Sequence, residues 1–317
     1  MVKRLVRLAD HVYRLALPYG EGTVNSYLFE GKNGYTVMDT GVQDEATRRE
    51  WKQLRDNGLV IEKVIITHTH PDHIGLAPWF QQEWNVPVIC SRNSYELMST
   101  YHRLLEQKQP DDHTPYAFNR KYDGPEIEER QFYRYMGSVW LEPDELYKNH
   151  DIVMLGDEPY EAIWTPGHAA DHFCFWHAPS KLLIAGDLMF ADTAPVIPFW
   201  SEEDVNPLED YFHSLDLIET YPAELVLPGH DHVIHDLHQR IRDIRNAHHF
   251  RMQQILGSLT EGRRTAGQLC REIYGTGRPA SQELLEFYTA LARLVYLRNE
   301  GFVESVTEGD KVYFQRK

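Results

Sequence analysis

Three histidines and one aspartate stand within six consecutive residues, directly after a short apolar run typical of a buried strand. The apolar run covers residues 63–67, and the cluster that follows contains His68, His70, Asp72 and His73. A rigid strand end with a tight loop can direct several side chains toward one point. Imidazole and carboxylate groups suit zinc, and also iron or manganese. This feature predicts a metal site at the edge of a β-sheet.

The same arrangement of a strand, a small turn and a metal-binding residue type recurs three times along the chain. His168 and His230 each follow a Pro-Gly pair, and Asp187 follows Gly186. One histidine after such a turn is usually an ordinary loop residue. Four endings of one kind in a single chain instead favour a shared site with seven candidate ligands.

Short strands and helices alternate through the first part of the chain. Strands are expected at residues 12–17, 25–30, 35–39, 63–67 and 86–90, and helices at residues 45–57 and 76–84. Further strands are expected at residues 152–155, 160–164, 173–177, 182–185 and 225–227, with a helix at residues 208–220. This mixture predicts an α/β domain of stacked layers.

Between about residues 92 and 150 the strand pattern is missing. This segment holds ten aromatic residues among charges and prolines, and helical pieces are plausible within it. We expect an insertion that acts as a lid over the site or as a dimer contact. An aromatic-rich insertion beside a metal site favours an apolar or acyl-bearing substrate.

The last part of the chain has a different pattern, mostly helical and closed by a hairpin. Helical spacing covers residues 236–259, 265–274 and 281–299, and Thr265 is a suitable N-cap for the second helix. Two short strands follow at residues 302–306 and 312–314. This layout predicts a helical linker and a winged-helix-like domain at residues 241–317, after a catalytic domain at residues 1–240. Its third helix carries Arg293 and Arg298 against Glu283 and Glu286, so it has no basic stripe.

Charge and composition disfavour some partners. The chain of 317 residues has a formal charge of −16, which disfavours polyanionic substrates and anionic membranes. Cys90, Cys174 and Cys270 form neither a disulfide framework nor a metal knuckle. Signal-peptide and membrane-spanning patterns are missing, so a cytoplasmic location is expected. A small-molecule substrate is favoured over nucleic acid, no membrane association is expected, and a homodimer is left open.

With these motifs the chain resembles the metallo-β-lactamase-fold hydrolases, particularly the glyoxalase II-like and β-lactamase-like endoribonuclease branches. The HxHxDH motif of the family is matched by His68, His70, Asp72 and His73, and its later ligands are matched by His168, Asp187 and His230. The resemblance covers roughly residues 12–234 and implies an αββα sandwich with two metal ions, most favourably Zn²⁺, at one edge. It assigns one metal to His68, His70 and His168 and the other to Asp72, His73 and His230, with Asp187 as the bridge.

Two supporting roles follow from the same resemblance, because Asp39 and His172 match residues that would support the ligands. Phe190, Phe199 and Trp200 follow Asp187 along the chain and are weaker candidates for a substrate pocket. A metal-bound hydroxide would be the nucleophile, with the catalytic residue Asp72 orienting it and carrying its proton. The cysteine ligand of some β-lactamases is missing, which disfavours antibiotic hydrolysis. We therefore expect a zinc-dependent hydrolase of small esters, thioesters or lactones. The alternatives are a metal-dependent endoribonuclease and a nucleic-acid-binding regulator with a vestigial metal site.

Overall fold

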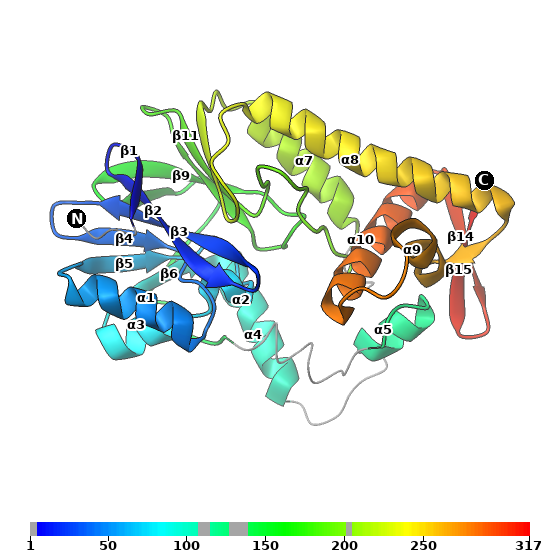
Figure 1. The fold of residues 1–317 in the computed structure, drawn as a ribbon, viewed down its shortest axis with the longest axis horizontal. Coiled ribbons are helices and arrows are strands. Elements are labelled where there is room, and N and C mark those ends of the chain that lie inside the picture. Colours follow the sequence, from blue (N-terminus) through cyan, green and yellow to red (C-terminus); the bar gives the residue numbers. More distant parts are fainter. Residues whose placement is uncertain (1–4, 107–114, 127–138, 201–204) are drawn as a thin grey trace.

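Two mixed β-sheets lie face to face in the computed structural model, which describes residues 5–106, 115–126, 139–200 and 205–317 (Figure 1). The first sheet has the order β1 (Val6–Ala9), β2 (Val12–Tyr19), β3 (Gly22–Glu30), β4 (Tyr35–Met38), β5 (Ile61–Ile65), β6 (Val88–Ser91) and β7 (Glu145–Tyr147). The second has the order β12 (Leu225–Pro228), β11 (Leu182–Gly186), β10 (Phe173–His177), β9 (Glu158–Trp164) and β8 (Ile152–Leu155).

One apolar cluster joins the facing surfaces of the two sheets. It contains Phe29 and Ile65 from the first sheet and Phe173, Phe175 and Ile184 from the second, all buried. A second cluster lies beneath α1 (Glu45–Asp56) and α3 (Ala77–Trp84) on the outer face of the first sheet. A third lies beneath α7 (Pro207–Glu219) and α8 (Leu237–Ser258) on the outer face of the second. The molecule is therefore an αββα sandwich, because each sheet buries both of its faces.

Local sequence explains most of these elements. Asp44 caps α1 by accepting a hydrogen bond from the Thr47 amide at 2.7 Å, and the helix buries Trp51 and Leu54 against the sheet. Helix α9 (Ala266–Tyr274) begins with a capping box between Thr265 and Gln268, at the N-cap that the sequence predicts.

Some short elements were not predicted. Strand β7 has three residues and pairs in parallel with β6, where the Asp144 carboxylate accepts the Val88 amide at 2.8 Å. Helix α2 (Pro71–Ile74) is a single turn that carries Asp72 and His73. Elements this short show no hydrophobic period, and tertiary contacts rather than local pattern define them.

The predicted insertion bridges two outer layers of the sandwich. Helix α4 (Arg92–Glu106) buries Met98 in the cluster beneath α1 and α3, whereas Phe118 and Tyr122, from and just after α5 (Pro115–Lys121), belong to the cluster beneath α7 and α8. Three of its aromatic residues, Phe132, Tyr133 and Tyr135, lie outside the described residues. A lid or dimer role for the insertion stays a prediction.

The C-terminal unit comprises α9, α10 (Ala280–Asn299) and a three-stranded sheet of order β13 (Arg264–Thr265), β15 (Lys311–Arg316) and β14 (Val303–Glu308). Its apolar residues, Leu291 and Phe314 among them, share one cluster with Leu183 and Val226 of the second sheet. The predicted boundary after residue 240 falls inside α8, so this helix is common to both units. No helix in the described part of the chain is long and apolar enough to cross a membrane.

Candidate metal centre

Seven imidazole and carboxylate groups from four loops meet at one edge of the sandwich. We call them the donor cluster: His68, His70, Asp72, His73, His168, Asp187 and His230. The loops follow β5, β9, β11 and β12, so four strand ends deliver them to one place. The donor atoms fall into two groups, each with all atoms within 4.8 Å of one another: His68, His70, His168 and Asp187 in the first, and Asp72, His73 and His230 in the second. The sequence predicted that these seven side chains would meet.

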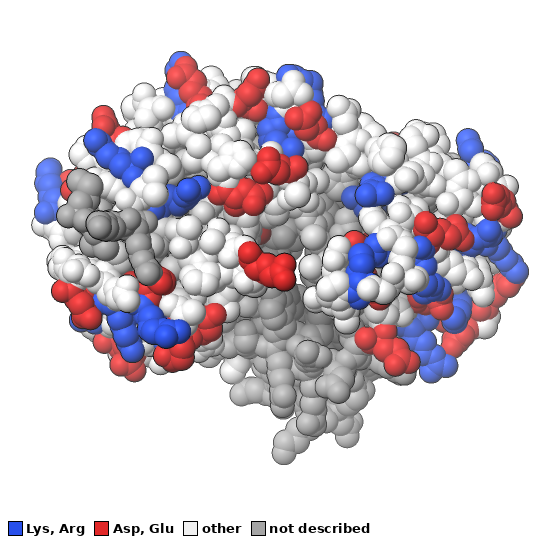
Figure 2. Space-filling view, in the orientation of Figure 1, with Lys and Arg blue, Asp and Glu red and all other residues white. Residues whose placement is uncertain are grey.

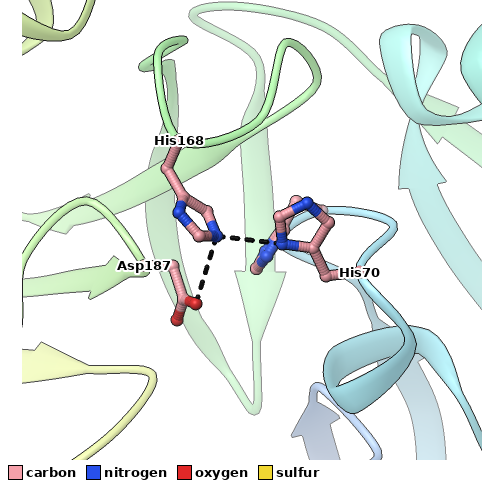
Figure 3. Close-up of side chains that lie close together, drawn as sticks. His70, His168 and Asp187 are labelled. Atoms are coloured by element: carbon pink, nitrogen blue, oxygen red, sulfur yellow. Dashed lines mark hydrogen bonds and ion pairs between the residues drawn. The ribbon is translucent and has the colours of Figure 1, made fainter. Parts of the chain in front are cut away.

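The first group is arranged around the His168 ring (Figure 3). Its Nε2 lies 2.9 Å from His70 Nδ1 and 3.3 Å from Asp187 Oδ2. The ring of His68 lies beside both imidazoles, with centroids 4.6 Å from His70 and 5.4 Å from His168. Three nitrogens and one carboxylate oxygen therefore converge, which is a donor set that suits zinc.

Asp187 connects the first group to the second. Its Oδ1 lies 3.3 Å from His73 Nε2, and its Oδ2 lies 3.6 Å from His230 Nε2 as well as 3.3 Å from His168 Nε2. Within the second group, Asp72 Oδ2 is 3.2 Å from His230 Nε2 and 3.7 Å from His73 Nε2. One carboxylate thus faces donors of both groups.

Several atoms of the donor cluster are buried and have no hydrogen-bond partner. They are His68 Nε2, His73 Nε2 and Asp187 Oδ1. A buried polar atom without a partner is rare, because its desolvation is not compensated. These atoms belong to residues that face each other across the two groups, so a pair of cations would satisfy them. The residues present fit a dinuclear metal site.

The outward-facing nitrogens fix which atom each imidazole presents. His168 Nδ1 donates to the Val196 carbonyl at 2.7 Å, and His230 Nδ1 donates to the Thr23 carbonyl at 2.9 Å. His73 Nδ1 donates to Asp39 Oδ2 at 2.8 Å. Each bond sets the tautomer that leaves Nε2 bare and directed inward, as is usual for metal-binding histidines.

Asp39 supports two loops at once. It has a left-handed backbone (φ 59°) directly after β4. Its Oδ1 accepts the Thr67 amide at 2.9 Å, and its Oδ2 accepts the Thr67 hydroxyl at 2.8 Å together with His73 Nδ1. The Thr67 oxygen lies 3.0 Å from His68 Nδ1, so the same network reaches a second imidazole. Asp39 lies where a supporting carboxylate was expected.

His172 holds a backbone rather than a donor atom. Its Nε2 accepts the Asp187 amide at 2.9 Å, and its Nδ1 donates to the Thr165 hydroxyl at 2.8 Å. Burial lowers the pKa of His172 to about 3, so the ring is neutral and can accept that bond. It fixes the start of the Asp187 loop.

The two groups differ in electrostatics. Burial and the nearby His168 lower the pKa of His70 to about 3, and burial with His73 and His70 lowers the pKa of His68. Burial alone would lower the pKa of His73, but the carboxylates of Asp187, Asp72 and Asp39 raise it overall. His68 and His70 are therefore neutral imidazoles, the form that binds a metal ion.

Asp171 was missed by the sequence reasoning. Its Oδ2 accepts the Thr69 amide at 2.9 Å and the Ser94 hydroxyl at 2.7 Å, and the residue is only 1% exposed. Burial raises its pKa. One carboxylate thereby ties the His68–His70 loop to the His168–His172 loop and to α4. Its position between two histidines was the only signal in the sequence, because its partners are distant along the chain.

Gly229 was missed as well. A Cβ atom on this residue would lie 2.1 Å from Asp187 Oδ1 and 2.9 Å from His73 Cε1. Its amide donates to the Gly186 carbonyl, and its carbonyl accepts the Asn25 amide, both at 2.7 Å. Only glycine allows the β12 loop to approach both groups this closely.

The predicted pocket residues occupy different environments. The Phe190 ring is half-buried and lies 5.1 Å from the His230 ring. Tyr19, which was not predicted, lies 5.5 Å from the same ring. Trp200 is half-buried, but Phe199 is buried against Phe118, so the Phe199 ring is part of the apolar core.

The fold and the donor cluster together define a class of protein. The sequence pattern of the metallo-beta-lactamase superfamily matches residues 19–230, and the chain belongs to this superfamily. The match ends at the last member of the donor cluster.

Similar proteins extend the likeness beyond the matched region. The probable metallo-hydrolase YqjP of Bacillus subtilis (strain 168) is 27% identical, over 95% of this chain and 96% of its own length. The beta-lactamase-like protein 2 homolog of Caenorhabditis elegans is 24% identical, over 96% and 90%. A metallo-beta-lactamase family protein from Thermus thermophilus has a solved structure with a TM-score of 0.83 and 26% identity, covering 98% of this chain and 100% of that one. These matches include the C-terminal unit.

Proposed function

We propose that the protein is a hydrolase that uses two divalent cations, most favourably Zn²⁺, to cleave a small ester, thioester or lactone. The observation that carries the proposal is the pair of donor groups joined by Asp187, with their outward nitrogens already bonded. His68, His70 and His168 would hold one cation, Asp72, His73 and His230 the other, and Asp187 both. The shared edge of two sheets keeps these groups rigid.

The cations and the protein would divide the chemistry. When bound, two cations lower the pKa of water from 15.7 to about 7 and polarise an oxygen of the scissile group. Burial would raise the pKa of Asp72, but the neighbouring imidazoles of His73 and His230 lower it overall. Its carboxylate is therefore charged at neutral pH and can accept and pass on a proton. Asp39 and His172 would hold the donors during this transfer.

A small, uncharged acyl substrate is favoured by the surroundings of the donor cluster. Phe190 and Tyr19 flank His230 with aromatic rings. On the face drawn in Figure 2, lysine and arginine side chains are interspersed with aspartate and glutamate, and the chain carries a formal charge of −16. A polyanion would be repelled by this field. Replacing the insertion by a short linker tests whether it selects the substrate, and unchanged specificity would argue against it.

We also propose a winged-helix topology for the C-terminal unit and membership of the branch that includes glyoxalase II-like and endoribonuclease-like enzymes. The helices α9 and α10 and the hairpin of β14 and β15 support the topology. A DNA-reading role has no support, because residues 287–295 of α10 are all buried and cannot enter a groove. Cytoplasmic location and dimerisation stay predictions from the sequence.

A parallel assay tests the function. Metal-loaded protein is offered thioesters, lactones, β-lactams and single-stranded RNA, and its metal content is measured by elemental analysis. We expect acyl hydrolysis with two zinc ions per chain, and a loss of about 10²- to 10⁴-fold in Asp72→Ala. Asp192→Ala, an exposed carboxylate on the loop after Asp187, is the matched control and should keep full activity.

Two results of this assay would contradict the proposal. Cleavage of RNA alone, abolished in Asp72→Ala, would favour the endoribonuclease. Protein purified without chelators and found free of metal would remove the basis of the mechanism.

A further inference from the structure

A short segment links the donor cluster to the C-terminal unit. His168 Nδ1 donates to the Val196 carbonyl at 2.7 Å, and three residues further on the Phe199 amide donates to the Tyr288 carbonyl in α10 at 3.3 Å. Ile197 and Phe199 are buried in the same cluster as Tyr288. The position of the His168 ring therefore depends on a segment that is attached to α10.

The Tyr288 side chain lies at the junction of three elements. The residue is fully buried, and its ring lies 4.5 Å from that of Trp200 and 6.3 Å from that of Phe118, onto which it stacks. Its hydroxyl donates to Asn119 Oδ1 at 2.8 Å. The Asn119 amide group donates to the Pro125 carbonyl at 2.9 Å, which fixes the orientation of that side chain. One tyrosine thus contacts the 196–200 segment and α5 together.

A second contact holds α5 against the C-terminal unit. Asp123, just beyond the helix, accepts bonds from Lys311 Nζ at 2.5 Å, from Arg271 Nη2 at 2.7 Å and from the Thr265 hydroxyl at 3.0 Å. The Gly267 amide donates to the Tyr122 carbonyl at 3.1 Å. Figure 1 shows α5 beside the hairpin of β14 and β15. The C-terminal unit therefore fixes both segments that Tyr288 touches.

We infer that Tyr288 is a positioning residue for the active site, through which α10 sets the location of His168 and of the 196–200 segment. On this view the C-terminal unit completes the active site. The inference rests on the proposed hydrolase function for its effect on substrate, but its effect on metal retention is independent of any substrate. The competing explanation is that Tyr288 only fills the core.

Kinetics on the best substrate of the assay panel separate these explanations. Tyr288→Phe removes one hydroxyl and no ring, so we expect KM to rise about 2- to 10-fold, as for the loss of one hydrogen bond, with kcat within about twofold. Tyr296→Phe, on the same helix but packed against Phe212, is the matched control and should change neither constant. Asn119→Ala should reproduce the Tyr288→Phe effect, and the double variant should be no worse than either single one.

Metal retention gives a readout that needs no substrate. Tyr288→Leu and Tyr288→Ala remove the ring that packs against the 196–200 segment. We expect zinc to be released to a chelator about 10-fold faster than from the wild type, because the support of His168 is loosened. The Tyr296→Leu control should release zinc at the wild-type rate. Tyr288→Phe should stay close to the wild type, because the ring remains.

The outcomes are distinguishable. If the wild type hydrolyses no member of the panel, the proposed function fails while the chelator experiment still decides the role of Tyr288. If the folded Tyr288 variants lose only thermal stability, with KM and zinc release equal to the Tyr296 controls, the residue fills the core and the inference is wrong. Should Tyr288→Ala fail to fold, Tyr288→Phe and Asn119→Ala still decide it through KM.

Discussion

Two parts of the structure support the donor cluster, and we call them the polar wall and the aromatic wall. One consists of the loops after β4, β5, β9, β11 and β12, and it is held by hydrogen bonds such as those of Asp39 and His172. The other consists of α5, the 196–200 segment and α10, and it is held by packed aromatic rings such as Tyr288 on Phe118 together with hydrogen bonds such as that of Tyr288 to Asn119. The first wall contains the donors. The second contains none of them, yet reaches them through Val196.

The difference teaches which wall can change without loss of chemistry. A hydrogen bond between buried groups depends on atom types and on distances of a few tenths of an ångström, and breaking it leaves a buried group unpaired. Aromatic packing depends on shape and volume, and it tolerates conservative substitution. We expect the polar wall to determine how water is activated and the aromatic wall to determine which substrate fits. Four variants test this comparison.

Gly229→Ala should have the largest effect. The added Cβ atom meets Asp187 Oδ1 at 2.1 Å and His73 Cε1 at 2.9 Å, so both donor groups must shift. Misplacement by about 1 Å can lower activity about 10²-fold, and we expect at least that loss together with reduced zinc content. Gly257→Ala is the matched control, because its Cβ atom meets nothing within 4 Å and a helical alanine stabilises by about 0.5–1 kcal/mol. Unchanged activity in Gly229→Ala would show that the polar wall tolerates shifts of its donors without loss of catalysis.

Asp39→Asn should come second. The new amide group would present a donor to His73 Nδ1 or to Thr67, both of which now donate to the carboxylate. Supporting partners of this kind change metal affinity by about 10- to 100-fold, and titration with zinc measures the change. Asp44→Asn, the same substitution at the N-cap of α1, keeps a suitable cap and should bind zinc normally. Equal zinc affinity in the two variants would remove Asp39 from the metal-binding network.

Asp171→Ala should mainly lower stability. It leaves the Thr69 amide and the Ser94 hydroxyl without their acceptor in a buried place, which costs about 1–3 kcal/mol in the free energy of unfolding. Asp171→Asn should cost less, because the amide oxygen can accept both bonds. Urea unfolding of the zinc-loaded protein measures the difference. Asp157→Ala, which removes an exposed acceptor of the Lys32 amide, should have little effect. A similar loss of stability in Asp157→Ala would mean that the burial of Asp171 does not explain the effect of Asp171→Ala.

Asp123→Asn should have the smallest effect and a characteristic pH dependence. Burial would raise the pKa of Asp123, but bonds from Lys311 and Arg271 lower it overall. A carboxyl whose folded-state pKa is lowered stabilises the fold above its unfolded-state value of about 3.9, and that contribution is lost as pH falls below it. We expect Asp123→Asn to lower the free energy of unfolding by about 1 kcal/mol at pH 7.

The difference in free energy of unfolding between the wild type and Asp123→Asn should then become smaller as the pH falls toward 4 and below. Urea unfolding across this range checks it. Asp310→Asn removes an exposed partner of Arg120 and serves as the control, with little change at any pH. If the wild type instead became more stable relative to Asp123→Asn as the pH falls, the pKa of Asp123 would not be lowered in the folded state.

Much of the polar wall could be predicted from the sequence. The donors lie in the short segments that follow four recognisable strands, so the seven side chains could be assigned to strand ends without knowing the sheet order. Asp39 and His172 followed from the family resemblance. Asp171 could not be predicted, because its Thr69 partner is 102 residues away and nothing local marks the contact. The closeness of Gly229 to Asp187 was hidden for the same reason.

The aromatic wall was only partly predictable. The insertion and its aromatic content were visible, as was the amphipathic helix that became α10. Helical spacing indicates that a face is buried, but it does not say against what. Phe199 was expected in a pocket and is buried in the core. The joining of Tyr288 to Asn119 depends on two segments 169 residues apart.

The sequence by itself predicted a layered α/β domain and the residues of the donor cluster, and the family resemblance added the αββα sandwich and the proposed hydrolase chemistry. The periodicity of a strand and the turn that follows the strand depend on neighbouring residues, so both can be predicted from a short stretch of sequence. Only the tertiary structure decided that Asp171 ties three segments together. It also decided that α10 packs against the 196–200 segment, which in turn contacts His168. These depend on distances between atoms far apart in the chain, which are set when the sheets and helices pack.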